Sequence, residues 1–184
     1  MKEKIERLLK NYSNTRRSWE SWCYLVSSGD FDFYTGRFDY ETSVRKIADN
    51  NKLLYHLRYL AFKDCHIELY KIVKNTTNNK DNIFILLNLL KIQRPDLQKE
   101  IQECLKMFED LSAEIKKMTT VRDKFYAHLD PDYKEHLDTK SGMEEYNKTL
   151  IAIETAIILL TSRETLQKVL DEIPSRNDFN LDLK

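Results

Sequence analysis

The chain has 184 residues, enough for one well-buried domain, and its 33% charged and 41% hydrophobic residues are typical of a globular protein. Thirty Lys and Arg residues balance thirty Asp and Glu residues, so no overall field draws the chain to a nucleic acid or a membrane surface. Only three glycines and three prolines are present, which favours long helices over a β-sandwich or a β-barrel.

Cysteine usage and the apolar runs predict where the protein resides. The three cysteines are widely spaced and form no Cys-x-x-Cys pair, which predicts reduced, packed thiols of a cytoplasmic protein rather than a disulfide framework or a zinc site. Residues 1–7 are charged throughout and lack the apolar core of a signal peptide. The most apolar run, 150–160, is interrupted by Glu154 and is far shorter than the ~20 residues that span a bilayer, so we expect no membrane partner.

The first predicted helix covers residues 3–27 and ends at a Ser-Ser-Gly-Asp sequence. An aromatic connector follows, and it is too rich in rings to be a free linker. We therefore expect residues 1–40 to form an N-terminal helix and connector packed on the body of the protein. The side chains expected to face inward are Ile5, Leu8, Leu9, Tyr12, Trp19, Trp22, Cys23 and Val26.

A second long helix is predicted from about residue 41 to residue 74, where a polar, Asn-rich loop ends it. A short apolar helix follows at 82–90, with Asp81 or Asn82 as its N-cap. The side chains of the long helix expected to face inward are Val44, Ile47, Leu54, Leu57, Ala61, Cys65, Leu69 and Ile72.

The next predicted helix begins with Asp96 as its cap and ends near Pro131, because a proline disfavours helix in the residue before it. Its apolar residues recur at spacings of four and three, which places them on one face. Continued, this stripe reaches Arg122, whose charge is costly to bury unless it is paired or faces a cleft or a partner. The stripe before Arg122 consists of Leu97, Ile101, Cys104, Phe108, Leu111, Ile115 and Met118.

After a loop to Gly142, a last long helix is predicted to reach about Ile173, and residues 174–184 to form a loose tail. Residues 41–173 then make up a helical bundle. The predicted fold is all-α, an up-and-down bundle of four to five main helices. The inward residues of the last helix are Met143, Tyr146, Leu150, Ile153, Ile157 and Leu160.

Arg122 and His128 are the first candidates for chemistry. His128 lies about 120° from Arg122 around an ideal helix, so the two flank the same stripe. Their spacing alone is weak evidence: ten arginines and four histidines in 184 residues give about 0.65 such pairs by chance. The position of Arg122 in an apolar stripe, with Asp123 directly after it, carries the interpretation.

The stretch 122–130, Arg-Asp-Lys-Phe-Tyr-Ala-His-Leu-Asp, resembles the signature of HEPN domains, which is an arginine, a polar residue and then a histidine after a short gap. It is most similar to the abortive-infection branch of that superfamily. The resemblance extends to the upstream helix at 63–73, the Asn-rich loop and the short apolar helix, about residues 45–165 in all. It implies a HEPN-like helical bundle, commonly a homodimer with the motif at the cleft between protomers.

The resemblance also implies a metal-independent endoribonuclease of the toxin or phage-defence type, with no cofactor and no metal. The motif assigns the catalytic roles to Arg122, Asp123 and His128. His128, with an unperturbed pKa of ~6.5, suits an acid or base acting on the 2′-hydroxyl, and the Arg122 guanidinium suits phosphate oxygens. Asp123 would orient either group, and Lys124 would hold RNA backbone phosphate beside His128.

Two alternatives stay open. One is a catalytically silent HEPN bundle that acts as a protein-interaction or nucleotide-binding module, which the balanced charge favours slightly. The other is that Arg122 forms a structural ion pair with Glu154. An antitoxin is a further expected partner, but Asp130 stands where members paired with a nucleotidyltransferase antitoxin often carry a tyrosine.

Overall fold

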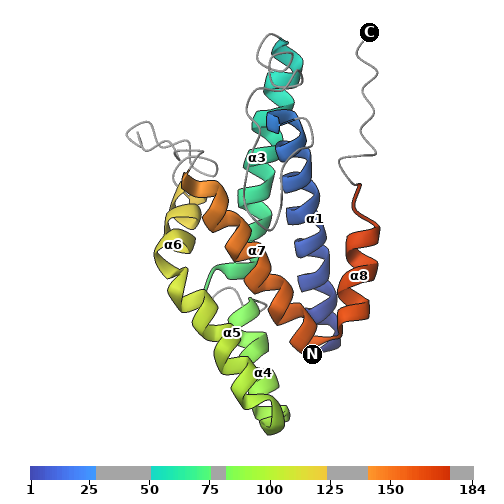
Figure 1. Cartoon of the computed structure of the whole chain (residues 1–184), viewed down its shortest axis with the longest axis vertical. Helices are drawn as coiled ribbons and strands as arrows, with labels where there is room; N and C mark the ends of the chain where they lie inside the picture. The colour runs from blue at the N-terminus through green and yellow to red at the C-terminus, as the bar shows by residue number, and fades with distance from the viewer. Residues whose placement is uncertain (28–50, 76–81, 124–140, 175–184) are drawn as a thin grey trace.

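The computed structural model describes residues 1–27, 51–75, 82–123 and 141–174, and every regular element within these ranges is helical. This confirms the all-α prediction, and the helices pack as a bundle (Figure 1). The elements are α1 (Lys2–Ser27), α3 (Lys52–Val73), α4 (Ile83–Gln93), the 3-10 turn η1 (Pro95–Leu97), α5 (Gln98–Asp110), α6 (Ser112–Val121), α7 (Ser141–Leu160) and α8 (Arg163–Asp171).

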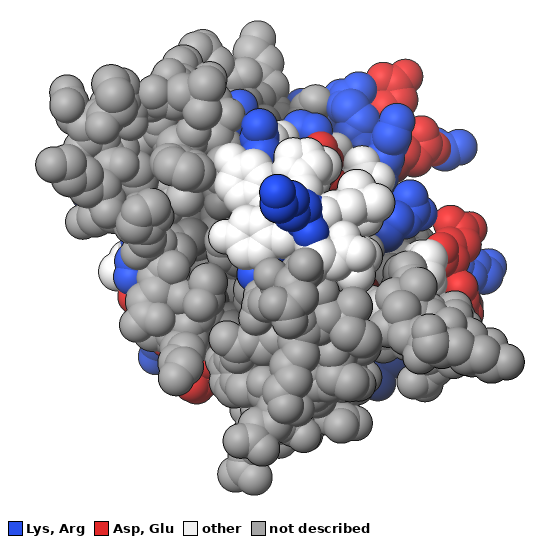
Figure 2. Space-filling view, turned by 90° about the horizontal axis from the view of Figure 1, so that it is seen from above, with Lys and Arg blue, Asp and Glu red and all other residues white. Residues whose placement is uncertain are grey.

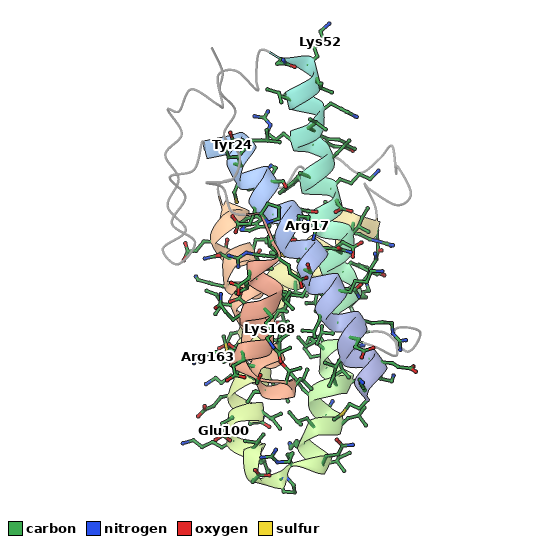
Figure 3. The ribbon with its side chains drawn as sticks, turned by 90° about the vertical axis from the view of Figure 1, so that its right-hand side faces the viewer. Arg17, Tyr24, Lys52, Glu100, Arg163 and Lys168 are labelled. Carbon is green, nitrogen blue, oxygen red and sulfur yellow. The ribbon has the colours of Figure 1, made fainter. Side chains whose placement is uncertain are left out.

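The bundle is built around α7, which contacts α1, α4, α5, α6 and α8. The most extensive helix pair is α1 with α3, and α8 packs along α1 near its N-terminal end. Figure 3 shows Tyr24 of α1 and Lys52 of α3 at one end of the molecule and Glu100 of α5 at the other. One hydrophobic core runs through this arrangement and takes side chains from all seven α-helices of the described residues.

Helix α1 is an integral part of that core. Trp19 is fully buried, and its ring stacks on that of Tyr146 of α7 with 4.4 Å between centroids and 7° between planes. The predicted inward face of α1 is confirmed at Leu8, Tyr12, Trp19, Trp22 and Cys23, whereas Ile5 and Leu9 are partly buried.

Helix α3 begins later than predicted. Asn51 has extended backbone angles (φ −107°, ψ 109°), and its side-chain oxygen accepts hydrogen bonds from the N–H groups of Leu53 and Leu54 at 3.0 and 3.2 Å. This is the chemistry of a helix N-cap, so the helix predicted from residue 41 is not continuous through Asn51. The aromatic connector, Val44 and Ile47 lie outside the described residues.

The N-terminal half of α3 projects beyond the core. Leu57, predicted to face inward, is 43% exposed, because the core proper begins about two turns later, at Cys65. Figure 2 looks onto this end of the molecule and shows uncharged side chains grouped around a basic one. The exposed apolar and aromatic side chains of this half are Leu53, Tyr55, Leu57, Tyr59 and Leu60.

The predicted long helix after residue 96 is two helices. Leu111 separates α5 from α6, because its ψ of 6° departs from helical geometry. Asp96 is not the cap: its carboxylate accepts hydrogen bonds from the Arg94 guanidinium at 2.6–3.2 Å. The cap predicted at Asn82 is confirmed, since its side-chain oxygen accepts a hydrogen bond from the N–H of Ile85 at 3.0 Å.

The apolar stripe nevertheless stays in phase across the break. The stripe residues that the structure buries are Ile101, Cys104, Phe108, Ile115 and Met118, and Leu97 and Leu111 pack partly buried against the core. Helix α7 also ends earlier than predicted, at Leu160. Ser162 is extended and caps α8, with its hydroxyl accepting from the N–H of Thr165 at 3.2 Å. The helix predicted to reach Ile173 is therefore also two helices.

The three cysteines are free and buried, as predicted. No helix in the described ranges combines the length and the apolar character needed to cross a membrane.

The core also buries an imidazole, that of His66. It is 2% exposed, and its Nδ1 lies 2.9 Å from the carbonyl oxygen of Phe62, an acceptor for the Nδ1–H group. Burial lowers the pKa of His66 from 6.5 to about 4, although the hydrogen bond to Phe62 opposes the shift. His66 therefore stays neutral in the folded protein at pH values where the unfolded chain already binds the proton.

We expect this difference to destabilise the protein in acid. The pKa of His66 is lower in the folded state than in the unfolded chain. The contribution of His66 to the free energy of unfolding is therefore complete above pH 6.5 and is lost as the pH falls toward 4. The loss between pH 7 and pH 4.5 is expected to be about 2–3 kcal/mol. Urea unfolding of wild type and His66→Gln at both pH values measures it, since the carboxylates titrate in both proteins. An equal pH dependence in the two proteins would contradict the assignment.

Candidate functional site

Arg122 and Asp123 lie at the C-terminal end of α6 and are the last described residues before residue 141. Arg122 keeps helical backbone angles (φ −58°, ψ −49°), and its N–H bonds back to the carbonyl of Met118. The helical backbone continues past the end of α6 at Val121 with π-helical geometry at Arg122 and Asp123, and this segment carries both side chains. Both are half-buried, with 28% and 33% of the side chain exposed.

The Arg122 side chain is held between a ring and a carboxylate. Its guanidinium carbon lies 4.1 Å from the centroid of the Tyr70 ring on α3, a cation–π geometry. Its Nη1 donates a hydrogen bond to Asp123 Oδ1 at 2.9 Å. Its Nε is buried and has no hydrogen-bond partner within the part of the chain that the structure describes. The side chain is thus held between the Tyr70 ring and the Asp123 carboxylate, with one buried donor that no described residue satisfies.

Lys74 brings a second cation to the same carboxylate. It caps the C-terminal end of α3, and its Nζ donates to Asp123 Oδ2 at 3.1 Å. The same ammonium lies 5.1 Å from the centroid of the Tyr70 ring, one turn earlier on the helix. We call these four residues, Tyr70, Lys74, Arg122 and Asp123, the Arg122 cluster. Two cations and one carboxylate give it a net charge of +1, which suits an anion.

The carboxylate of Asp123 stays ionised in this setting. Partial burial opposes ionisation, but the hydrogen bonds and charges of Arg122 and Lys74 outweigh it and hold the pKa of Asp123 below its usual value. Asp123 therefore bridges the two cations across the neutral pH range, and α3 is tied to the end of α6.

The alternative that Arg122 pairs with Glu154 is not what the structure has: Arg122 pairs with Asp123. Glu154 instead accepts hydrogen bonds from two residues of α1, from Arg16 Nη1 at 2.9 Å and from the hydroxyl of Tyr12. Arg16 also bonds Glu20, one turn along α1, at 3.0 Å. Glu154 interrupts the apolar run of α7 because it fastens α7 to α1.

The structure thus brings together two of the four predicted site residues, Arg122 and Asp123. Lys124 and His128 lie outside the described residues. Sequence reasoning missed Tyr70 and Lys74, which precede the motif by about fifty positions. Their spacing of four places them on one helix face, but nothing in the sequence showed that this face meets Arg122.

Within the described ranges, no group of three or more His, Cys, Asp and Glu side chains is placed to hold a metal ion. Comparisons with known proteins add no relative: no protein-family model, no curated protein and no solved structure matches the chain. The Arg122 cluster contains a planar guanidinium fork and an ammonium, two groups whose chemistry suits a phosphate.

Proposed function

We propose that this chain is a metal-independent endoribonuclease of the HEPN type, acting in the cytoplasm as a toxin or phage-defence effector. The observation that carries the proposal is the state of Arg122. A guanidinium is stacked on Tyr70 and bonded to Asp123, and its buried Nε has no partner among the described residues. An unpartnered buried donor is costly unless a ligand completes it, and a phosphate oxygen is the acceptor that its fork fits.

The proposed reaction needs a base, an acid and a group that stabilises charge. The 2′-oxygen of the RNA attacks the adjacent phosphorus, the bond from phosphorus to the 5′-oxygen breaks, and a 2′,3′-cyclic phosphate remains. His128 exchanges protons with the 2′-hydroxyl or with the leaving 5′-oxygen. Arg122 holds the phosphate oxygens, Asp123 orients Arg122, and Lys124 holds the neighbouring backbone phosphate.

Each chain supplies one such histidine, so a homodimer with the motif at its interface divides the acid and base roles between two copies of His128. RNA is then the substrate, and an antitoxin is the partner that restrains the activity. The second candidate function is a catalytically silent HEPN bundle that binds a nucleotide or another protein. The zero net charge favours it, because long RNA gains little attraction from the chain as a whole.

Incubation of the purified full-length chain with total cellular RNA in EDTA tests the proposal. Wild type is expected to cut the RNA and to leave 2′,3′-cyclic phosphate ends, and His128→Ala purified in the same way is expected to leave the RNA intact. The variant also controls for contaminating nucleases. Intact RNA with wild type, or equal cutting by both proteins, would refute the nuclease. Cutting that disappears on adding EDTA would refute the metal-independent mechanism.

A further inference from the structure

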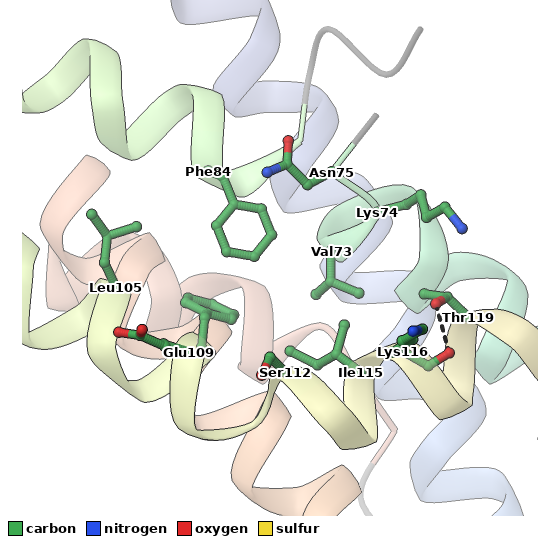
Figure 4. A pocket seen from close by; sticks show the side chains of 11 residues that line it. Val73, Lys74, Asn75, Phe84, Leu105, Glu109, Ser112, Ile115, Lys116 and Thr119 are labelled. Carbon is green, nitrogen blue, oxygen red and sulfur yellow. Dashed lines mark hydrogen bonds between the residues drawn. The ribbon is translucent and has the colours of Figure 1, made fainter. Parts of the chain in front are cut away.

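A cavity of about 380 Å³ lies beside the Arg122 cluster, between the C-terminal end of α3 and helices α4, α5 and α6. Its wall is mainly apolar and includes Val73, Phe84 and Ile115 (Figure 4). Such a volume is at the small end of the range for ligand pockets, and a mostly apolar wall with a few polar groups is their usual composition.

The cavity and the Arg122 cluster share one residue, Lys74. Lys74 lines the cavity and also bonds Asp123 at 3.1 Å. Thr119, which lines the cavity from α6, is one turn before Arg122 and Asp123 on the same helix. The cavity and the Arg122 cluster are therefore neighbours along the end of α3 and along α6.

The cavity offers an aromatic ring to that ligand. Phe84 of α4 projects into the middle of the cavity and is only partly buried (Figure 4). The Phe84 ring packs edge to face on the ring of buried Phe108, with 5.2 Å between the two centroids. This contact with the core supports the orientation of the Phe84 ring. A fixed ring in an open apolar cavity is a surface on which a nucleobase can stack.

Charges at the two ends of the cavity differ in sign. Lys74 and Lys116 lie at one end and Glu109 at the other, next to Leu105 (Figure 4). A nucleotide therefore has one favourable direction, with its phosphate toward the two lysines and its base toward Glu109. A glutamate carboxylate accepts hydrogen bonds only, so it favours bases with an exocyclic amino group.

We propose that this cavity is the subsite for a nucleobase of the RNA strand whose phosphate lies on the Arg122 cluster. The proposal rests on the proposed function for the identity of the ligand. Phe84 stacks on the base, Glu109 accepts a hydrogen bond from the exocyclic amino group of adenine, cytosine or guanine, and Lys74 joins the subsite to the phosphate. Uracil, which has no amino group, is disfavoured.

Binding of 2′-O-methyl RNA hexamers to the full chain tests the subsite apart from cleavage, because the methyl group blocks the attacking oxygen. Phe84→Leu is expected to weaken the binding of the adenine hexamer by about 5- to 150-fold, the range that loss of one base–aromatic stack gives. Ser112→Phe, which fills the cavity from an exposed rim position, is expected to weaken it as well without altering the core. Ile92→Ala, on an exposed position of α4, is the matched control and is expected to bind as wild type does.

Glu109→Gln tests the direction of the base. Wild type is expected to bind the adenine and cytosine hexamers about 5- to 150-fold more tightly than the uracil hexamer, and the variant to lose most of this preference because an amide also donates. A mononucleotide such as AMP is expected to bind more weakly than the hexamers, since it lacks the neighbouring phosphates.

The outcomes separate the subsite from the nuclease. If wild type binds the hexamers as expected but cuts no RNA, the proposed function fails and the subsite stands. If wild type cuts RNA while Phe84→Leu and Ser112→Phe bind and cut as wild type does, the subsite fails and the nuclease stands. Equal affinity for AMP and the hexamers, or no binding of either, overturns the subsite.

Discussion

Replacement of Arg122 by lysine is expected to slow RNA cleavage by about 10²–10³-fold, the usual cost of removing one donor that stabilises transition-state charge. Lysine keeps the positive charge but has neither the planar fork nor the flat face that lies 4.1 Å from the centroid of the Tyr70 ring. Asp123 would still be paired through Lys74 at 3.1 Å, so the fold at the end of α6 is expected to persist. Single-turnover rates on a labelled RNA in EDTA measure the effect.

The chain contains a matched control for this substitution. Arg58 also lies over a tyrosine of α3, with its guanidinium carbon 4.8 Å from the centroid of the Tyr55 ring, and it is far along the helix from Lys74. Arg58→Lys is expected to leave the rate unchanged. A wild-type rate for Arg122→Lys would mean that only the charge at this position matters. Equal losses in both variants would point to a general change in α3.

Hydrophobic periodicity predicted most of the buried positions of the helices, with Leu57 of α3 an exception, but it did not predict where the helices break. Leu111 has no proline or glycine beside it, and Ile115 continues the apolar stripe in phase. The hydrophobic periodicity therefore contains no signal of the break between α5 and α6. The break before α8 did leave a signal, because Ser162 followed by an acid in the next turn is typical of a helix start. The apolar residues continue past Ser162, however, and for that reason a single helix reaching Ile173 was predicted.

Only the part of the candidate site that lies on a single helix could be predicted from the sequence. The stripe placed Arg122 where its charge had to be paired or to face a cleft, and Asp123 was its neighbour. The partners on α3 depend on how two helices pack, which spacing within one helix does not encode. For the same reason the sequence left open a pairing of Glu154 with Arg122, whereas the packing of α1 on α7 pairs Glu154 with Arg16.

The position of α1 in the core has a direct consequence for stability. Trp19→Ala is expected to lower the free energy of unfolding by about 3–5 kcal/mol, the usual cost of truncating a fully buried tryptophan. The Trp19 ring stacks on Tyr146 and lies 5.2 Å from Trp22, so truncation leaves a cavity between α1 and α7. Because whole domains have only about 5–15 kcal/mol of stability, this loss is large. Urea unfolding measures it.

Ile92→Ala, at a side chain 76% exposed, is the control and is expected to change stability by less than about 0.5 kcal/mol. Helix α1 packs along α3, which carries Tyr70 and Lys74, so a single cooperative transition is expected for α1 and the Arg122 cluster together. A loss below about 1 kcal/mol for Trp19→Ala, or a separate early transition, would show that α1 is peripheral to the bundle. In that case the geometry of the Arg122 cluster would not depend on α1, and Trp19→Ala would leave RNA binding intact.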